Sequence, residues 1–474
     1  SRGLGDVYKR QKDFGNHHFK VMAGFNQESS YQETLDTYSY NQAVLDVPAM
    51  SSGTGTIKAT DSYSEYAIRG GFFRVNYNYL DKYLLEVNGR YDGSSKFPKS
   101  SRFGFFPSVS AGWQIAQERF MNSTRHWLDG LKLRASYGVI GNQNINPYTF
   151  TPSMSVNNKA TSWIIDDTYV TSISSLPALV SQNFTWEKVG TINVGLDVNL
   201  FNNRLSGVFE WYQRNTNGML APGVQLPAVV GASAPYQNTA DMRTRGWELS
   251  LNWRDQIGKV GYRIGFNLSD YKSEIIKYDD NAATKLLSSY YPGQTLGEIW
   301  GYVVDGYYTV DDFVDTSSWQ LKEGVTSING YNVRPGDVKF KNLRDDDTST
   351  NVITSGDNTF DNPGDRKVIG NTTPRYQYGI NLGMNYAGFD LNVILQGTGK
   401  RDYWISNVLT FPMNGDNFVP LFEGLSDYWM PKDPDNGDWS AVNPNAKYPR
   451  IYGNRGNSGS NLRQSDKYLS DASY

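Results

Sequence analysis

The 474-residue sequence contains no cysteine, three histidines and no long apolar run. Without cysteine, thiol catalysis, thiolate metal sites and disulfides are all excluded. The histidines are His17, His18 and His126, too few and too clustered to favour a histidine-based catalytic or zinc site. No stretch approaches the roughly 18 apolar residues that a transmembrane helix requires. A net charge of -3 gives no support to nucleic-acid binding.

The chain is also poor in the aliphatic residues that fill a large soluble core. Hydrophobic residues make up 38% of the sequence and the mean hydropathy is -0.56, although aromatic residues reach 14% and tyrosine outnumbers phenylalanine. A soluble domain of this length normally carries more Leu, Ile and Val in a continuous core. This composition favours a large sheet with one apolar and one polar face.

Residues 103–142 show that pattern most clearly. In 103–115, alternate residues are apolar, and the residues between them are Gly, Ser and Gln, with Phe106 as the one exception. In 131–139, Leu, Ala, Tyr and Val alternate with Lys, Arg, Ser and Gly. Because successive side chains of a strand point to opposite faces, both segments are predicted to be strands with one apolar face.

The same alternation recurs along the whole chain and predicts about eleven strands. They are expected at 18–27, 73–79, 83–91, 103–115, 131–139, 192–200, 205–212, 247–254, 260–268, 376–386 and 389–397.

The predicted connections alternate between short and long. Short ones lie at 80–82, 202–203, 256–258 and 387–388, and long ones at 28–65, 143–184, 215–245 and 273–374. Residues 93–102 are a short loop among the long ones, and residues 117–129 a longer connection among the short ones. Short turns opposite long loops, wet polar faces and aromatics at strand ends are typical of outer-membrane barrels. An antiparallel sandwich with one solvated face is the rival interpretation.

Several segments, in this order, resemble the barrel of SusC/RagA-type TonB-dependent outer-membrane importers. They are YLDKYLLEVNGRYDGSSKF, RFGFFPSVSAGWQIAQERFM, LKLRASYGVIGNQNI, FTWEKVGTINVGLDVNLFNNRLSGVFEWYQRNTNGML, TRGWELSLNW, GYVVDGYY and PRYQYGINLGMNYAGFDLNVILQG. The resemblance implies a 22-stranded barrel around an N-terminal plug, a SusD-type lid lipoprotein and energy supplied by TonB. It further implies the outer membrane of a Gram-negative bacterium and substrates that are chiefly oligosaccharides, with peptides in some members.

The chain departs from that pattern at both ends. Residues 1–11, SRGLGDVYKRQ, resemble an adapter-derived, non-native segment, with the tail of a preceding strand as the alternative. Residues 12–474 are predicted to be a partial transmembrane β-barrel, all-β and antiparallel. We expect the plug, the N-terminal domains, the TonB-contacting segment and the final strands to lie outside it, which leaves an open sheet.

Two sets of residues are candidates for function. Charges on the polar faces are expected mainly to form cross-strand pairs that hold a plug or order water; they are Glu86, Arg90, Arg134, Asp197, Glu210, Glu248, Arg254 and Arg263. Aromatics in the long loops are the candidates for contact with substrate or lid, since sugar rings stack on aromatic faces. They are Trp163, Trp300, Tyr302, Tyr307, Tyr308, Trp404, Trp429 and Trp439.

An acidic loop follows the PGD motif at 335–337. Asp345, Asp347, Asp361 and Asp365 are a weak calcium candidate. Calcium requires six to eight oxygens in a tightly turned loop, and the D-x-D-x-D-G spacing is missing. A solvated acidic loop is favoured, and no cofactor is expected.

The preferred function is therefore the barrel portion of an active importer of large nutrients, without enzymatic activity, because no nucleophile–base pair is supported. The alternatives are a passive porin or adhesin barrel and a secreted carbohydrate-binding β-sandwich.

Overall fold

The computed structural model describes most of the chain. The described residues are 2–44, 46, 49–154, 177–224, 226–281, 284–286, 290–344, 351–405, 422–452 and 460–474, with four two-residue strands, β7 to β10, at Val156–Asn157, Ile164–Ile165, Thr168–Tyr169 and Ile173–Ser174. The chain forms two compact units, Ser1–Arg245 and Gly246–Tyr474, and the boundary falls within one long strand.

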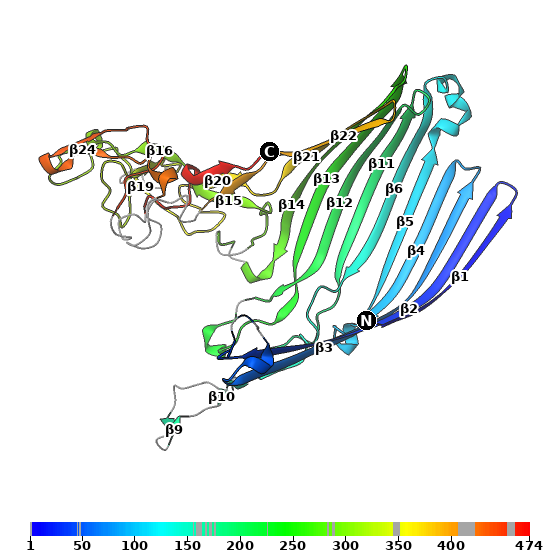
Figure 1. The fold of residues 1–474 in the computed structure, drawn as a ribbon, viewed down its shortest axis with the longest axis horizontal. Helices are drawn as coiled ribbons and strands as arrows, with labels where there is room; N and C mark the ends of the chain where they lie inside the picture. Colours follow the sequence, from blue (N-terminus) through cyan, green and yellow to red (C-terminus); the bar gives the residue numbers. More distant parts are fainter. Residues whose placement is uncertain are drawn as a thin grey trace. The chain divides into compact units, whose positions relative to one another are not determined.

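Twelve long strands form one sheet within the described residues (Figure 1). They are β1 (Arg2–Phe14), β2 (His17–Ser39), β3 (Ile57–Tyr79), β4 (Tyr83–Ser94), β5 (Phe103–Gln114), β6 (Leu128–Asn142), β11 (Glu187–Leu200), β12 (Leu205–Pro222), β13 (Tyr236–Ile257), β14 (Val260–Tyr278), β21 (Arg375–Tyr386) and β22 (Phe389–Lys400). The sheet follows the chain order. Strands β1 and β22 end the order with one neighbour each, so the sheet is open, as predicted.

The twelfth strand is the one that the sequence patterns did not predict. Strand β1 lies in the segment assigned to a foreign origin, yet it pairs with β2 from Arg2 opposite Ser29 to Phe14 opposite His17. A turn at 15–16 joins the two strands. The non-native origin of residues 1–11 stays a prediction.

Several strands continue well beyond their apolar segments. Strands β2 and β3 each have 23 residues and pair along their whole length, although the sequence predicted a strand only over 18–27 and a loop to 65. Strands β12 and β13 likewise occupy much of the predicted 215–245 loop and leave 223–235 as the connection. The apolar alternation stops where a strand leaves the apolar band, so sequence periodicity ends before the backbone pairing does.

The short connections are tight turns, as predicted. Leu80 and Asp81 have φ values of 55° and 54°, and Asn202 and Asn203 have values of 60° and 58°. At 387–388, Gly388 has a φ of 89°. Successive residues with positive φ are what two-residue turns between twisted antiparallel strands require. Turn geometry therefore sets the register of each hairpin.

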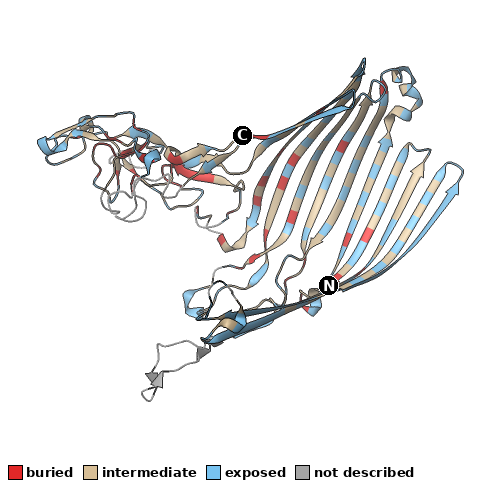
Figure 2. Cartoon of the chain, in the orientation of Figure 1, coloured by how far each residue is buried: buried red, intermediate tan, exposed pale blue. Residues whose placement is uncertain are grey.

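Cross-strand register gathers the apolar residues of neighbouring strands on one face. In unit 1 a single row runs across seven strands from Phe19 through Tyr77, Leu85, Ala111, Ala135 and Val194 to Trp211. Phe19, Leu85 and Trp211 are all exposed. Exposure alternates residue by residue along the first half of β2 and along β5 (Figure 2). We call this apolar face the outer face and the opposite face the inner face.

The predicted hundred-residue loop between β14 and β21 is not structureless. Together with the residues after β22 it contains three hydrophobic clusters. The short strands of this loop are β15 (Glu298–Tyr302), β16 (Val304–Tyr307), β17 (Ser327–Ile328), β18 (Val338–Phe340), β19 (Val352–Ile353) and β20 (Arg366–Asn371). Those after β22 are β23 (Asp402–Trp404), β24 (Pro431–Asp433), β25 (Asp438–Ala441) and β26 (Leu469–Asp471). A loop that buries its own aromatics can hold one conformation without a regular sheet.

All helices among the described residues are single or double 3-10 turns. They are η1 (Met50–Ser52), η2 (Lys99–Ser101), η3 (Ile115–Gln117), η4 (Arg119–Thr124), η5 (Ala228–Val230), η6 (Asp279–Asn281), η7 (Val310–Asp312), η8 (Glu423–Leu425), η9 (Pro434–Asn436) and η10 (Asp466–Tyr468). None of these helices in the described part of the chain has the length and apolarity needed to cross a membrane.

Candidate functional site

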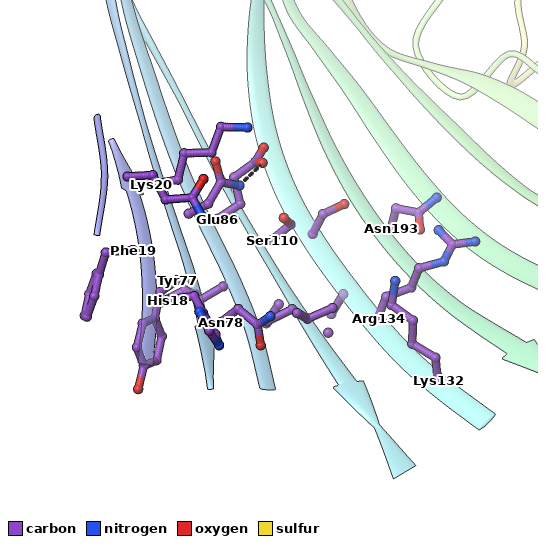
Figure 3. Close-up of a pocket in the computed structure, with 18 residues that line it drawn as sticks. His18, Phe19, Lys20, Tyr77, Asn78, Glu86, Ser110, Lys132, Arg134 and Asn193 are labelled. Atoms are coloured by element: carbon purple, nitrogen blue, oxygen red, sulfur yellow. Dashed lines mark hydrogen bonds between the residues drawn. The ribbon is translucent and has the colours of Figure 1, made fainter. Parts of the chain in front are cut away.

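The inner face of unit 1 carries a hollow of about 520 Å³ that is lined by both polar and apolar residues (Figure 3). Polar side chains from β2 to β6 and β11 line it: His18, Lys20, Asn76, Asn78, Glu86, Ser110, Lys132, Arg134, Ser136 and Asn193. These residues occupy alternate positions on paired strands. Because alternate side chains of a strand point to opposite faces, the apolar ones lie mainly on the outer face and the polar ones on this inner face. Within the described residues, no ion pair is formed by Lys20 or Lys132.

Arg134 is the centre of a charged cluster at the edge of this hollow. Its Nε lies 3.0 Å from Oδ1 of Asp197, and its Nη2 donates to Oε1 of Glu210. Asn193 donates from Nδ2 to the second oxygen of Glu210 at 3.2 Å. Three neighbouring strands are thereby linked through one guanidinium. The three charges were predicted to pair across strands, and they do.

Glu86, on β4, is the centre of a second network of hydrogen bonds on the inner face. It accepts hydrogen bonds from the side-chain amides of Asn76 and Asn88, the latter at 2.8 Å, and Arg74 Nε lies 3.8 Å away. Further along the same strand, Arg90 pairs with Asp92 at 2.9 Å. The polar network therefore continues along the inner face, with carboxylates held by amides and guanidiniums.

The remaining predicted inner-face charges lie in unit 2. Arg263 donates from Nη2 to Oδ1 of Asn392 at 2.6 Å, a contact that links β14 to β22 across β21. Arg254 and Arg263 line a shallow hollow with Asp255 and Asp390. Glu248 lies on β13, and its side chain is exposed. The inner face of unit 2 is thus polar in the same way.

Phe106, the exception in the alternation of β5, has a structural explanation. It lies on the inner face, where it packs with Phe97, Phe184 and Trp186 in a buried cluster. The Trp186 indole also donates to the carbonyl of Arg102 at 2.8 Å. The partners of Phe106 in this cluster come from the connections before β5 and before β11, and these segments gave no periodic signal.

Five of the predicted loop aromatics form the interior of the loops. Tyr302, Tyr308 and Trp429 are buried, and so is Trp300, whose Nε1 donates to Tyr291 Oη at 2.9 Å. Tyr307 is partly buried and donates to the Ala446 carbonyl at 3.0 Å. Burial raises the pKa of both the Tyr307 and Tyr308 hydroxyls. Their contact with substrate or lid stays a prediction.

The other three aromatics differ in their surroundings. Trp404 is half-buried and donates from Nε1 to the Ser465 carbonyl at 3.1 Å. Trp439 is half-buried and meets Trp319 edge to face, with ring centroids 5.1 Å apart. Trp163 lies outside the described residues. Trp439 and Trp319 therefore form a half-buried indole pair, and nothing in the tryptophan positions alone indicated that they meet.

The PGD motif joins two distant loop segments. Asp337 is buried and accepts hydrogen bonds from the backbone N–H of Arg334 at 2.7 Å, from Asn461 Nδ2 at 3.0 Å and from the Tyr452 hydroxyl. Burial raises the pKa of its carboxyl, against the effect of these donors. The side-chain Oδ1 of Asn461 in turn accepts from Val338 N–H at 2.8 Å. Sequence patterns missed this residue because its two side-chain partners, Tyr452 and Asn461, lie more than a hundred positions away.

The acidic loop is described only in part. Asp345 and Asp347 lie outside the described residues. Asp361 is exposed, while Asp365 is fully buried and accepts from the backbone N–H groups of Leu343 and Thr354 at 2.8 and 2.7 Å. Because both of its carboxylate oxygens accept backbone N–H groups, Asp365 has a structural role in the loop. In the described part of the chain, no three His, Asp or Glu residues are grouped as metal ligands would be.

The sequence of this chain is similar to those of known TonB-dependent receptors. The chain is 28% identical over 407 residues to TonB-dependent receptor P3 of Formosa agariphila, which covers 82% of this chain and 37% of that protein. It is 31% identical over 274 residues to TonB-dependent receptor SusC of Bacteroides thetaiotaomicron, covering 56% and 26% respectively. The chain thus spans less than half the length of these relatives.

The fold matches that of a solved importer, and a family model covers nearly the whole chain. A structure of the RagAB peptide importer in the "closed-closed" state aligns with 99% of this chain and 47% of its own, with a TM-score of 0.75 and 21% identity. Relatives of this kind are outer-membrane proteins of Gram-negative bacteria, as predicted. Residues 2–473 match the model "TonB dependent receptor-like, beta-barrel", and the chain belongs to that family as a SusC/RagA-type barrel.

Proposed function

We propose that this chain forms part of the wall of an active importer that carries large nutrients, chiefly oligosaccharides, across the outer membrane. The observation that supports this most directly is the two-sided sheet. Its outer face is apolar and exposed, and its inner face carries linked polar networks around Arg134 and Glu86. A wet, hydrogen-bonding inner face lets a hydroxyl-rich solute pass without losing all its polar contacts. A passive porin or adhesin barrel is the alternative.

Oligosaccharides are the proposed substrate class because of the loops. Their half-buried indoles, Trp319 and Trp439, meet edge to face, and Trp439 directly follows the sequence Asp435-Asn436-Gly437-Asp438. Aromatic faces stack on the apolar faces of sugar rings while amides and carboxylates bind their hydroxyls. RagAB, which has the same fold, is a peptide importer, so a peptide is the alternative ligand to test.

The proposed partners follow from the same assignment. A SusD-type lipoprotein would cover the long connections as a lid, and TonB would act through an N-terminal part of the full-length protein. The long connections carry the loop clusters, whereas the short turns leave little surface for a lid. No nucleic acid and no cofactor is proposed.

Uptake by the full-length protein tests the active mechanism. Cells that express it should accumulate a labelled oligosaccharide only when TonB is present and the membrane is energised. The matched comparison is the same strain without TonB, with surface abundance measured in both. Equal uptake in the two strains would support the passive pore instead.

A pair of tryptophan variants tests the substrate site. Trp439→Ala should weaken oligosaccharide binding about two- to tenfold, the range expected for one stacking contact, and leave the loops folded. Trp300→Ala removes a buried ring and should cost about 3–5 kcal/mol of loop stability. Calorimetric titration with oligosaccharides and with peptides, alongside limited proteolysis, separates the two effects. Unchanged affinity for both ligand classes in Trp439→Ala would contradict the assignment.

A further inference from the structure

The connection between β5 and β6 is longer than the other short turns, and it exposes both aromatic and basic side chains. Residues 115–127 form the two 3-10 helices η3 and η4, the cyan coil beyond the end of β5 in Figure 1. The other short connections of unit 1 have two to four residues. We call residues 118–127 the rim coil. Nothing in the two-sided sheet alone requires this insertion.

Glu118 fixes the rim coil to the outer side of the sheet. Its carboxylate accepts hydrogen bonds from the Tyr83 hydroxyl at 2.8 Å and from Trp113 Nε1 at 3.2 Å, and Lys82 Nζ lies 3.1 Å away. Tyr83 and Trp113 are cross-strand partners on the outer face. These bonds lower the pKa of the Glu118 carboxyl, with the Tyr83 hydrogen bond as the largest cause. The coil therefore starts at the apolar edge rather than over the polar inner face.

Two aromatic side chains of the rim coil are exposed, one two residues after Glu118 and one at the end of the coil. Phe120 is 66% exposed and Trp127 39% exposed. The Trp127 carbonyl accepts from the N–H of Phe201, an exposed aromatic in the next short turn, at 2.8 Å. Exposed aromatics that continue an apolar transmembrane face are typical of the membrane interface.

The rim coil also carries two uncompensated cations. Arg119 and Arg125 are exposed, and neither guanidinium has an ion pair or hydrogen bond within the described residues. Because Lys82 already neutralises Glu118, the coil keeps the charge of both arginines. A guanidinium matches a phosphate in shape and charge.

The depth of the coil agrees with phosphate contact. Tyr83 and Tyr91 mark the two ends of the outer face of β4, eight positions apart. At about 3.4 Å per residue and a tilt of about 40° they differ in depth by about 21 Å, close to an apolar band of about 25 Å. The coil extends past Tyr83, into the layer of roughly 5–8 Å that headgroups occupy. Short turns face the periplasm in such barrels.

We propose that the rim coil is a binding site for anionic glycerophospholipid of the periplasmic leaflet, with Phe120 and Trp127 at the hydrocarbon boundary and Arg119 and Arg125 on the phosphate. The two arginines explain a preference for anionic over zwitterionic headgroups, since a net positive charge remains after the Lys82–Glu118 pair. The site holds one side of the barrel at a fixed depth during transport, and it does not depend on which nutrient is carried.

Lipid retention tests the charge requirement. Full-length protein is titrated in detergent with phosphatidylglycerol or phosphatidylcholine, and bound lipid is counted by native mass spectrometry. Arg119→Gln and Arg125→Gln should each weaken phosphatidylglycerol binding about fivefold, the effect expected of one basic side chain near an anionic surface, with no change for phosphatidylcholine. Lys99→Gln removes an exposed cation in the loop between β4 and β5, at the opposite end of β5 from the rim coil, and should have no effect. Equal losses in all three variants, or none, would overturn the proposal.

Depth measurement tests the aromatic contact and controls for misfolding. A spin label at Phe120→Cys, as the only cysteine of the full-length protein, should collide with oxygen more than with a water-soluble nickel chelate in vesicles containing phosphatidylglycerol. A label at Lys99→Cys should show the reverse. Heat-modifiable gel mobility confirms that each variant is folded. A water-exposed label at position 120 in a folded barrel would refute membrane contact.

Discussion

Replacing Val87 with Arg places a guanidinium on the outer face of β4, midway between the exposed rings of Tyr83 and Tyr91. Four residues separate Val87 from each ring, which is about 14 Å along the strand and about 10 Å in depth at a tilt of about 40°. Its cross-strand partners are Val75 and Val109. The position is therefore near the bilayer midplane and surrounded by aliphatic side chains.

An arginine on the lipid face costs about 2–4 kcal/mol at the midplane. That cost corresponds to a roughly 30- to 1,000-fold change in the folding equilibrium. Ser110→Arg is the matched control, because Ser110 lies within one residue of the same depth, on the inner face. It is opposite Glu86 and lines the inner-face hollow, where a cation finds both space and a carboxylate. This substitution should cost less than about 1 kcal/mol.

The assay is chemical denaturation of the full-length protein in lipid vesicles, followed by heat-modifiable gel mobility and tryptophan fluorescence. Val87→Arg should lower the midpoint of unfolding clearly, and Ser110→Arg should leave it nearly unchanged. Equal losses in both variants would show that the inner and outer faces have been assigned wrongly. A larger loss in Ser110→Arg would reverse them.

Three further predictions concern single residues. Gly336→Ala should loosen the loops, because Gly336 has a φ of 88° and an added Cβ would lie 2.3 Å from the Trp429 ring; faster limited proteolysis with an intact barrel is the expected result. The hydrogen bond from the Ser317 hydroxyl is the chief cause of a lowered pKa of the Asp315 carboxyl. The turn at 315–318 should therefore keep full amide protection above pH ~4 and lose it as the pH falls through the folded-state pKa. Hydrogen exchange that shows protection independent of pH between 5 and 1 would argue against this. Arg134→Met should cost about 1–3 kcal/mol, because it leaves the Glu210 carboxylate unpaired, and adding Glu210→Met should recover part of that loss in the same denaturation assay.

The sequence by itself determined the two-sided strands, the order of short and long connections, and the family. A period of two is a local property, since each side chain is placed by its own backbone and by the lipid or water beside it. For this reason the outer-face row through Leu85 and Ala111, and the tight turn at Asn202, were predictable from residues within a few positions. The pairing of Arg134 with Asp197 and Glu210 followed from the same alternation once neighbouring strands were paired.

Only the tertiary structure decided what depends on partners distant in the chain. Asp337 is buried because Asn461 and Tyr452 meet it there, and Phe106 occupies the inner face because Phe184 covers it. The extension of β2 and β3 beyond the apolar band likewise rests on backbone hydrogen bonds, which leave no periodic trace in side chains exposed on both faces. Loop contacts of this kind form between segments without local pattern, so their energy is visible only when the chain is folded.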